Sequence, residues 1–278
     1  MYRLLGEMGH EAIVVSPRRI RLIAESTLKT DAIDAEILAR LSLVPGWLQP
    51  IYQRSQAGQV LRARLRARSS LVRSRTALVN AVRGTLRAHG YRLPGGAVAS
   101  FVTRLGALEL DEELRSALDP LAQTVAHLTQ QIEGIDRALA ELSETDELLA
   151  QLQTIPGVGK LVSLGFVAWM DRPERFRRSR DVGACLGLRP RLRSSGGVVH
   201  RGRITREGDC EMRRLLVQGA HAAMKCRRDS QLKRWAEELE KRVGKKKAVV
   251  ALARKIAVLM HRLWITGEGF EAFPAAAR

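Results

Sequence analysis

The chain has 278 residues, 45% of them hydrophobic, and it carries a net charge of +18 with a pI near 11.0. This composition excludes wholesale disorder, allows two domains, and predicts a polyanionic partner, with nucleic acid favoured over an anionic membrane. No apolar run approaches the roughly 20 residues that a bilayer requires, so we expect no membrane partner. Three scattered cysteines, Cys185, Cys210 and Cys226, lack metal-ligand spacing and predict reduced thiols in a cytoplasm.

The N-terminal segment predicts a piece of an α/β domain. Residues 2–9 are typical of the end of a helix stopped by Gly9, and His10–Val15, which ends in the apolar residues Ile13, Val14 and Val15, predicts a short buried strand. Helix, strand and helix in succession are typical of an α/β sheet. Because one strand cannot form a sheet, we expect the chain to begin within such a domain.

A helix with paired carboxylates follows at Lys29–Leu41. Asp31 and Asp34 stand three residues apart, so both carboxylates lie on one face of the helix. At that spacing they can share a hard cation such as Mg²⁺. The alternative is that they are ordinary acids in the first turn, favoured there by the helix dipole.

Two long helices are predicted in the middle of the chain. The first runs from about Ser55 to His89, with a narrow apolar stripe and an arginine-covered remainder. The second is predicted to begin at Asp119-Pro120, where an N-cap precedes a proline, and carries three heptads of apolar residues. The heptads predict a coiled coil, either between the two helices or between chains.

Arginines are concentrated in two parts of the sequence. Between Glu36 and Glu109 there are twelve arginines and no acidic residue, and from Arg175 to Arg206 there are ten arginines and only Asp181 as an acid. Such a run is commonly a solvated face. Two long runs without counter-charges favour a polyanion that neutralises them.

A tight turn within Leu152–Ala168 joins two helical stretches. Gly157 and Gly159 expose backbone N–H groups there, with Lys160 beside them, and the arrangement resembles the helix-hairpin-helix element of DNA binders. A plain helix–helix connection is the alternative. Residues 230–242 and about 248–266 predict two further helices.

The most basic stretch, Arg189–Arg214, contains the turn Ser194–Gly197. Glycine beside a hydroxyl lets a backbone approach closely, and the flanking arginines supply a field that attracts phosphate. After Gly208-Asp209 the apolar spacing becomes helical, so we expect a helix to start there and add affinity for an anion. The alternative is a basic, solvated surface loop.

In combination these segments resemble a DEDD-type insertion-sequence transposase of the one-hundred-and-ten family, which includes the Piv-type DNA invertases. The resemblance covers almost the whole chain in the family's order. The matching segments are SPRRIRLIAE, KTDAIDAEILAR, IPGVGKLVSLGFVAWM, RFRRSRDVGACLGLRP and SSGGVVHRGRITREGDCEMRRLLVQGA.

The resemblance implies a mainly α protein in three parts: the end of an RNase H-like (RuvC-like) catalytic domain at 1–50, a basic helical coiled-coil region at 51–150, and a helical transposase domain at 151–278. It implies that Asp31 and Asp34 hold Mg²⁺ and that Ser195 forms a covalent link to DNA, with Ser194 as the second candidate. It also implies a homo-oligomer on DNA, an element-encoded structured RNA and association with the bacterial nucleoid. The expected nucleic-acid contacts are Arg191, Arg193, Arg201 and Arg203 as a phosphate clamp, Arg213 and Arg214 as backbone anchors, and Gly157, Gly159 and Lys160.

The family's catalytic set has four acids, and the first two precede the part that matches this sequence. Two carboxylates offset the charge and dehydration of Mg²⁺ poorly. We therefore expect an N-terminally truncated chain that does not catalyse strand exchange alone. Two alternatives remain: a remnant that only binds nucleic acid, and a coiled-coil scaffold whose arginines neutralise RNA.

Overall fold

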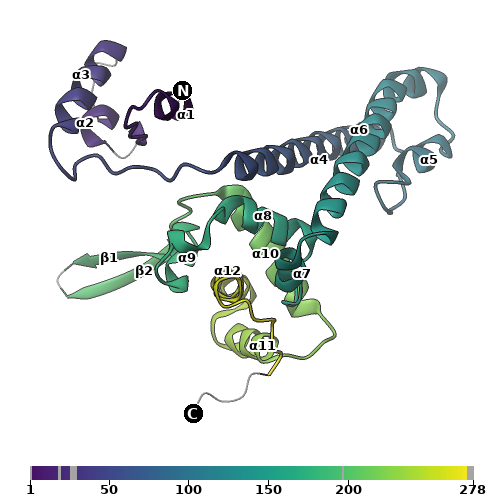
Figure 1. Ribbon diagram of the computed structural model, residues 1–278. Helices are drawn as coiled ribbons and strands as arrows, with labels where there is room; N and C mark the ends of the chain where they lie inside the picture. Colours follow the sequence, from purple (N-terminus) through teal and green to yellow (C-terminus); the bar gives the residue numbers. More distant parts are fainter. Residues whose placement is uncertain (1, 18–19, 26–29, 196, 274–278) are drawn as a thin grey trace. The chain divides into compact units, whose positions relative to one another are not determined.

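The computed structural model describes residues 2–17, 20–25, 30–195 and 197–273 (Figure 1). The chain divides into two compact units, Met1–Ser55 and Gln56–Arg278. Taken over the described residues as a whole, the chain is mainly helical, as the sequence predicts.

The first unit is helical in its described part, with α1 (Tyr2–Glu7), α2 (Arg21–Ala24) and α3 (Asp31–Ser42). The predicted strand at His10–Val15 is wrong. This segment pairs with no other strand within the described residues, and Ile13 is 51% exposed. One backbone hydrogen bond, from Ile51 N–H to the carbonyl of Val14, ties the segment to the end of the unit. The RNase H-like character of residues 1–50 stays a prediction.

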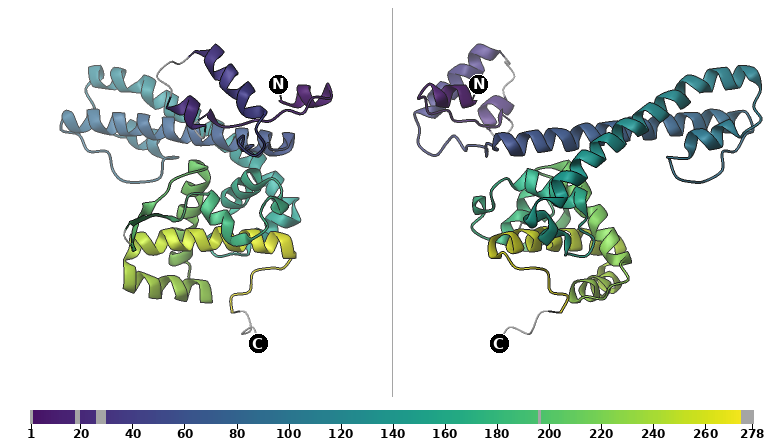
Figure 2. Two further views of the ribbon diagram at one scale, coloured as in Figure 1. Left: turned by 90° about the vertical axis from the view of Figure 1, so that its left-hand side faces the viewer. Right: turned by 45° about the vertical axis from the view of Figure 1, so that its right-hand side comes forward.

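The second unit begins with an arm of two 33-residue helices, α4 (Gln56–Ala88) and α6 (Glu112–Glu144), which pack along each other (Figures 1 and 2). The short helix α5 (Phe101–Gly106) packs on α6 and buries Phe101 completely. Apolar residues at helical spacing form the contact, for example Val82, Leu86 and Val125. The coiled coil itself, within or between chains, stays a prediction.

The expected start of the second long helix at Asp119-Pro120 is wrong, because α6 begins seven residues earlier at Glu112 and Pro120 lies inside it. A proline in a helix leaves the carbonyl four residues before it without its partner. Pro120 is exposed, so water can satisfy that carbonyl, and the contacts of Leu114 and Leu118 with the apolar cluster extend the helix beyond the local signal.

The body of the second unit is a helical cluster around α12. Apolar side chains from all six of its helices form one core, in which Leu252, Ile256 and Met260 of α12 are fully buried. The elements are α7 (Glu147–Gln153), α8 (Lys160–Met170), η2 (Pro173–Arg175), α9 (Ser179–Cys185), α10 (Cys210–Lys225), α11 (Gln231–Val243) and α12 (Lys245–Thr266). None of the helices in the described residues is both long and apolar enough to cross a membrane.

The basic stretch expected to be a loop forms an antiparallel hairpin of β1 (Pro190–Ser195) and β2 (Val198–Ile204). The register pairs Ser195 with Val198 and Arg193 with His200, and a bulge interrupts it between Pro190 and Leu192. Of the predicted turn Ser194–Gly197, Ser194 and Ser195 belong to β1, Gly197 lies in a turn and residue 196 lies outside the described residues. The two strands were not predicted.

Candidate functional site

The root of the β-hairpin is packed tightly against the end of α9. Gly187 and Gly208 both have positive φ, of 66° and 74°. A Cβ at Gly187 would collide with the backbone of Glu207, and one at Gly208 with the carbonyl oxygen of Cys185. Glycine is thus required at both positions, for backbone conformation and for close approach. The close backbone packing at these two glycines therefore holds the root of the hairpin in a fixed position on α9.

Arg213 of α10 holds the same root from inside. Its Nη1 donates to the carbonyl oxygen of Leu186 at 3.1 Å and also to that of Glu207. The backbone adds a hydrogen bond from Thr205 N–H to the carbonyl of Arg189, 2.9 Å long. Arg213, expected as an anchor on nucleic acid, therefore has a structural role in this fold.

The tip of the hairpin carries the expected nucleophile. Ser195 ends β1, and Gly197 in the turn has a φ of 79°. The side chains of Arg193, Ser194, Ser195 and Arg201 lie outside the described part of the structure, which therefore leaves their predicted roles open. Of the other two clamp arginines, both exposed, Arg191 donates to the carbonyl of Thr205 at 3.3 Å and Arg203 has no hydrogen bond or ion pair among the described residues.

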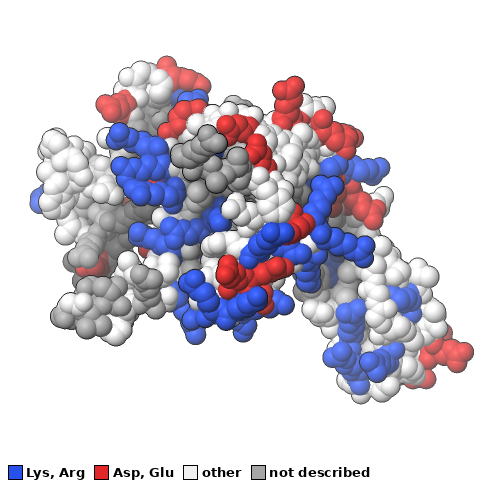
Figure 3. Space-filling view, turned by 90° about the horizontal axis from the view of Figure 1, so that it is seen from below, with Lys and Arg blue, Asp and Glu red and all other residues white. Residues whose placement is uncertain are grey.

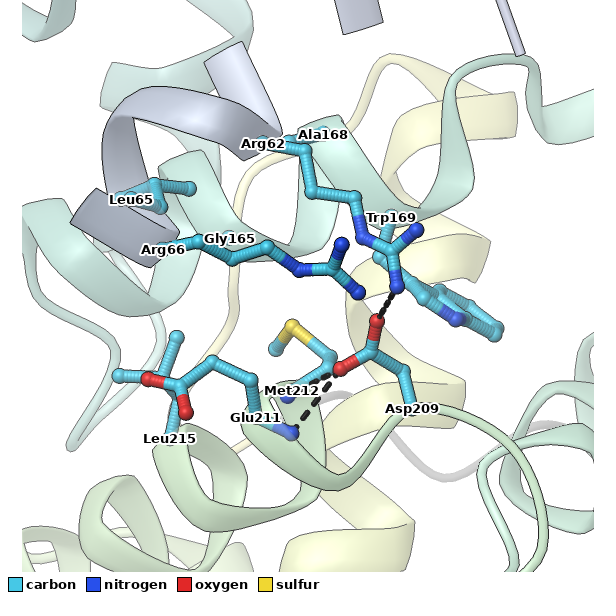
Figure 4. Close-up of a pocket in the computed structure, with 10 residues that line it drawn as sticks. All are labelled: Arg62, Leu65, Arg66, Gly165, Ala168, Trp169, Asp209, Glu211, Met212 and Leu215. Carbon is cyan, nitrogen blue, oxygen red and sulfur yellow. Dashed lines mark hydrogen bonds and ion pairs between the residues drawn. The ribbon is translucent and has the colours of Figure 1, made fainter. Parts of the chain in front are cut away.

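Asp209 links the hairpin root, α10 and the arm. Its Oδ1 accepts hydrogen bonds from the N–H groups of Glu211 and Met212, at 2.9 and 3.0 Å, and so caps α10. Its Oδ2 pairs with the guanidinium of Arg62 on α4 (Figure 4). Burial by itself would raise the pKa of Asp209, but the hydrogen bond from Met212 and the charge of Arg62 outweigh it and hold that pKa below its ordinary value.

A second contact between α10 and α4 lies one turn further along. Glu211 pairs with Arg214, and Arg214 Nη2 lies 3.4 Å from Ser69 Oγ of α4. Burial would raise the pKa of Glu211, yet its hydrogen bonds with Arg214 and Ser69 lower it overall. Arg214 is exposed, but its guanidinium already contacts Glu211, Gln218 and Ser69, so the predicted phosphate would compete with Glu211 for it.

The gap between these helices is too small for a ligand. It measures about 20 Å³, the space of one water, and lies among α4, α8 and α10 (Figure 4). In Figure 4, Arg62 and Arg66 reach over it from α4. Gly165 faces Leu215 so closely that an added Cβ would lie 2.7 Å from its Cδ1. This is a packing interface that fixes the arm on the body.

The helix-hairpin-helix-like turn splits into a packed half and an exposed half. Gly157 has a φ of 83° and presses on α10, where a Cβ would collide with Gly219 and lie 2.7 Å from the nitrogen of Ala223. Gly159 caps α8, is exposed and has open space beside it. Lys160 is also exposed and pairs with Glu144 at 2.8 Å. Only Gly159 and Lys160 therefore face solvent in the way the DNA-binding interpretation requires.

Asp31 and Asp34 both lie in the first turn of α3, behind the N-cap Thr30, whose side chain accepts from Ile33 N–H. They face solvent at least in part. Among the described residues there is no group of three or more histidine, cysteine, aspartate or glutamate side chains that could hold a metal ion. Two carboxylates do not complete the six-oxygen shell of Mg²⁺, so the described residues do not fit a complete site.

The Arg62–Asp209 pair is a site feature that sequence reasoning missed. Its members are 147 positions apart, and each had a sufficient local explanation, Arg62 as one of many surface arginines and Asp209 as a helix cap. No local pattern relates them.

Two family models match the chain. The model described as "Transposase IS116/IS110/IS902 family" matches residues 149–236, and a DEDD-type IS110 model described as "Transposase" matches residues 1–90. The chain is 33% identical over 264 residues to the transposase for insertion sequence element IS1328 of Yersinia enterocolitica. The matched region covers 92% of this chain and 78% of that protein. It is 30% identical over 276 residues to a probable family 20 transposase of Pseudomonas aeruginosa, a match that covers 94% of this chain and 79% of that protein. It is 29% identical over 269 residues to the transposase for insertion sequence element IS1111A of Coxiella burnetii, a match that covers 94% of this chain and 73% of that protein.

Proposed function

Because this chain belongs to the IS116/IS110/IS902 family of transposases, we propose that it binds the DNA of an insertion sequence and that Ser195 is the nucleophile of strand exchange. One observation carries the proposal: Ser195 ends the first strand of an arginine-rich hairpin whose root is mounted rigidly on α9 and α10. A fixed root restricts where the hairpin tip can move relative to bound DNA.

The proposed step is an in-line displacement at phosphorus. The Oγ of Ser195 forms a bond to phosphorus and gives up its proton, while the bond from phosphorus to one sugar oxygen breaks and that oxygen takes up a proton. The arginines of the hairpin would stabilise the negative charge that develops on the phosphoryl oxygens. Candidates for this clamp are Arg191, Arg193, Arg201 and Arg203.

Asp31 and Asp34 would contribute two ligands to the divalent metal that membership of a DEDD transposase family suggests. The remaining ligands have to come from outside this pair. In the three-part organisation that we propose, these acids belong to residues 1–50, the basic arm to 51–150 and the serine hairpin to 151–278.

The arm supplies surface for the nucleic-acid partners. Arg64, Arg66 and Arg87 of α4 are exposed and have no hydrogen bond or ion pair among the described residues, in contrast to Arg62 and Arg68, which pair with acids. Lysines and arginines also form groups on the face seen in Figure 3. We propose that these groups bind element DNA and a structured RNA, and that the arm joins copies of the chain on the bacterial nucleoid.

The test compares Ser195→Ala with Ser194→Ala in the full chain, incubated with DNA of the element's ends. It measures only the covalent attachment of the chain to DNA, and complete strand exchange by this chain alone is not required. Covalent complexes are counted on denaturing gels, and binding is measured by fluorescence anisotropy over a salt series. We expect Ser195→Ala to lose the covalent complex and to keep salt-sensitive binding, while Ser194→Ala keeps both. A covalent complex that survives in Ser195→Ala would refute the assignment, and loss of binding in that variant would give the hairpin tip a structural role instead.

A further inference from the structure

A second cavity lies away from the serine hairpin, between the start of α11, one face of α12 and residues 268–273, which we call the C-terminal strap. It measures about 560 Å³, within the range of small-ligand sites. Figures 1 and 2 show the strap leaving the end of α12 and passing α11.

Specific hydrogen bonds hold the strap in this place. The carbonyl of Ala272 accepts from Gln231 N–H at 2.8 Å, and Phe270 N–H donates to Thr154 Oγ1 at 3.1 Å. Gln151 Nε2 donates to the carbonyl of Glu268 and, at 3.1 Å, to that of Leu263. The cavity therefore has a defined wall.

The wall formed by α12 is cationic. Lys255 and Arg262 stand about two turns apart on one face of the helix, and neither has an ion pair among the described residues. Lys255 Nζ lies 4.1 Å from the centre of the Trp235 ring, which holds the ammonium at the edge of the cavity. Burial lowers the pKa of Lys255. Lys255 is exposed and has no ion pair among the described residues, so its ammonium can pair with a phosphate at the cavity.

The other walls restrict the kind of anion. Leu259, Leu263 and Phe270 provide apolar and aromatic surface, and Glu268 and Glu271 of the strap balance the two cations. A small inorganic anion would meet as much negative as positive charge in the lining and would leave the apolar wall uncovered. A ligand with phosphate at one side and a flat ring at the other matches both surfaces.

We propose that this cavity holds one nucleotide of a single-stranded nucleic acid, with Lys255 and Arg262 on successive phosphates and Phe270 against the base. In a duplex the bases are stacked and paired inside the helix, so duplex DNA cannot place a base there. The inference goes beyond the proposed function and rests on it only in taking a nucleic acid as the ligand.

The test measures the affinity of the full chain for a labelled 15-nucleotide oligothymidylate by anisotropy over a salt series. The variant Lys255→Ala/Arg262→Ala is compared with Lys245→Ala/Lys246→Ala, which removes the same charge from exposed residues at the start of α12, outside the cavity. We expect about tenfold weaker binding for the cavity variant and a salt slope smaller by about 1.4, from about 0.7 for each of two phosphates. Equal losses in the two variants would overturn the proposal.

Two further variant pairs report on the base and on the strap. Phe270→Ala should weaken oligothymidylate binding about fivefold or more, whereas Phe273→Ala, which lies over Arg234 outside the cavity, should not. Glu268→Gln/Glu271→Gln should strengthen binding more than Glu133→Gln/Glu141→Gln on the arm. The reverse order in either pair would count against the cavity.

A direct readout uses an oligonucleotide carrying 5-iodouracil. Photo-cross-linking should label the peptide that contains Phe270, and labelling confined to other peptides would refute the proposal even if all variants fold. Duplex binding and the covalent complex at Ser195 should stay within about twofold of wild type in the cavity variant. Failure of the cavity proposal is therefore distinguishable from failure of the proposed serine chemistry.

Discussion

Replacing Asp209 by alanine should destabilise the second unit well beyond the loss of a helix cap. The substitution removes the side chain that caps α10 and, at the same time, the acid that pairs with Arg62 of the arm. The side chain of Asp209 is 8% exposed and that of Arg62 is 25% exposed. Solvent therefore screens this pair only in part.

The magnitude follows from these two losses. Loss of an N-cap costs about 1 kcal/mol. Removal of one partner from a fully buried ion pair costs roughly 3–5 kcal/mol, and we discount this to about 1–2 because Arg62 can turn toward water. The expected total is about 2–3 kcal/mol. Asp209→Asn should cost less, because asparagine can still cap the helix.

Urea denaturation followed by circular dichroism measures the free energy of unfolding. The matched control is Asp146→Ala, since Asp146 caps α7 through Leu149 N–H and has no ion pair among the described residues. A double-mutant cycle of Arg62→Ala and Asp209→Ala then isolates the coupling, expected at about 1–2 kcal/mol. If Asp209→Ala costs no more than Asp146→Ala, or the coupling is below about 0.5 kcal/mol, the link between the arm and the body is refuted.

Two further predictions concern packing and pH. Gly157→Ala should lower the free energy of unfolding by about 2–4 kcal/mol, because the positive φ of Gly157 and its contact with Gly219 both exclude a side chain. Gly159→Ala, where the space is open, should lower it by under about 1 kcal/mol. Thermal unfolding of both variants measures the difference, and equal effects would contradict the prediction. The pKa of Asp209 is lowered in the folded chain, so the stability it contributes is present above its ordinary pKa of 3.8 and is lost as the pH falls through the lower folded value. The difference in unfolding temperature between wild type and Asp209→Asn should therefore shrink from pH 7 toward pH 3, and a constant difference would show that the carboxylate charge is not responsible.

Where a local pattern also determines the fold, the sequence was a sufficient guide. A helix was predicted to follow Gly208-Asp209 from its apolar spacing, and α10 begins at Cys210 with Met212, Leu216 and Ala220 buried. Both the cap and the apolar spacing act over a few residues, so they can be read without knowledge of the rest of the chain.

Predictions that depended on contacts with residues distant in the sequence were wrong in several places. The segment His10–Val15 ends in three β-branched residues, as many strands do, but a strand requires a neighbour, and none pairs with it in the described residues. Pro120 has the local context of a helix start, yet packing against α4 and α5 extends α6 to both sides of it. The two strands of the long basic stretch were not predicted, because arginines that alternate with other residues are equally typical of a solvated loop.

For the candidate site, the sequence indicated which residue types could bind nucleic acid, but not which of these residues are already bonded within the fold. Arg62 and Arg213 resembled their neighbours, and only the fold shows that one pairs with Asp209 while the other donates to backbone carbonyls at the hairpin root. Gly157 likewise matched a phosphate-binding turn, although its lack of a side chain serves close packing with α10. Such assignments depend on residues far apart in the chain.

The most direct test of the central claim identifies the atom that bonds to DNA. The full chain is trapped on element-end DNA, the DNA is digested with nuclease and the protein with trypsin, and the peptide Ser194–Arg201 is fragmented in a mass spectrometer. We predict a nucleotide remnant on Ser195, with Ser194 unmodified. A remnant on Ser194 or on any residue outside this peptide would contradict the assignment of Ser195 as the nucleophile.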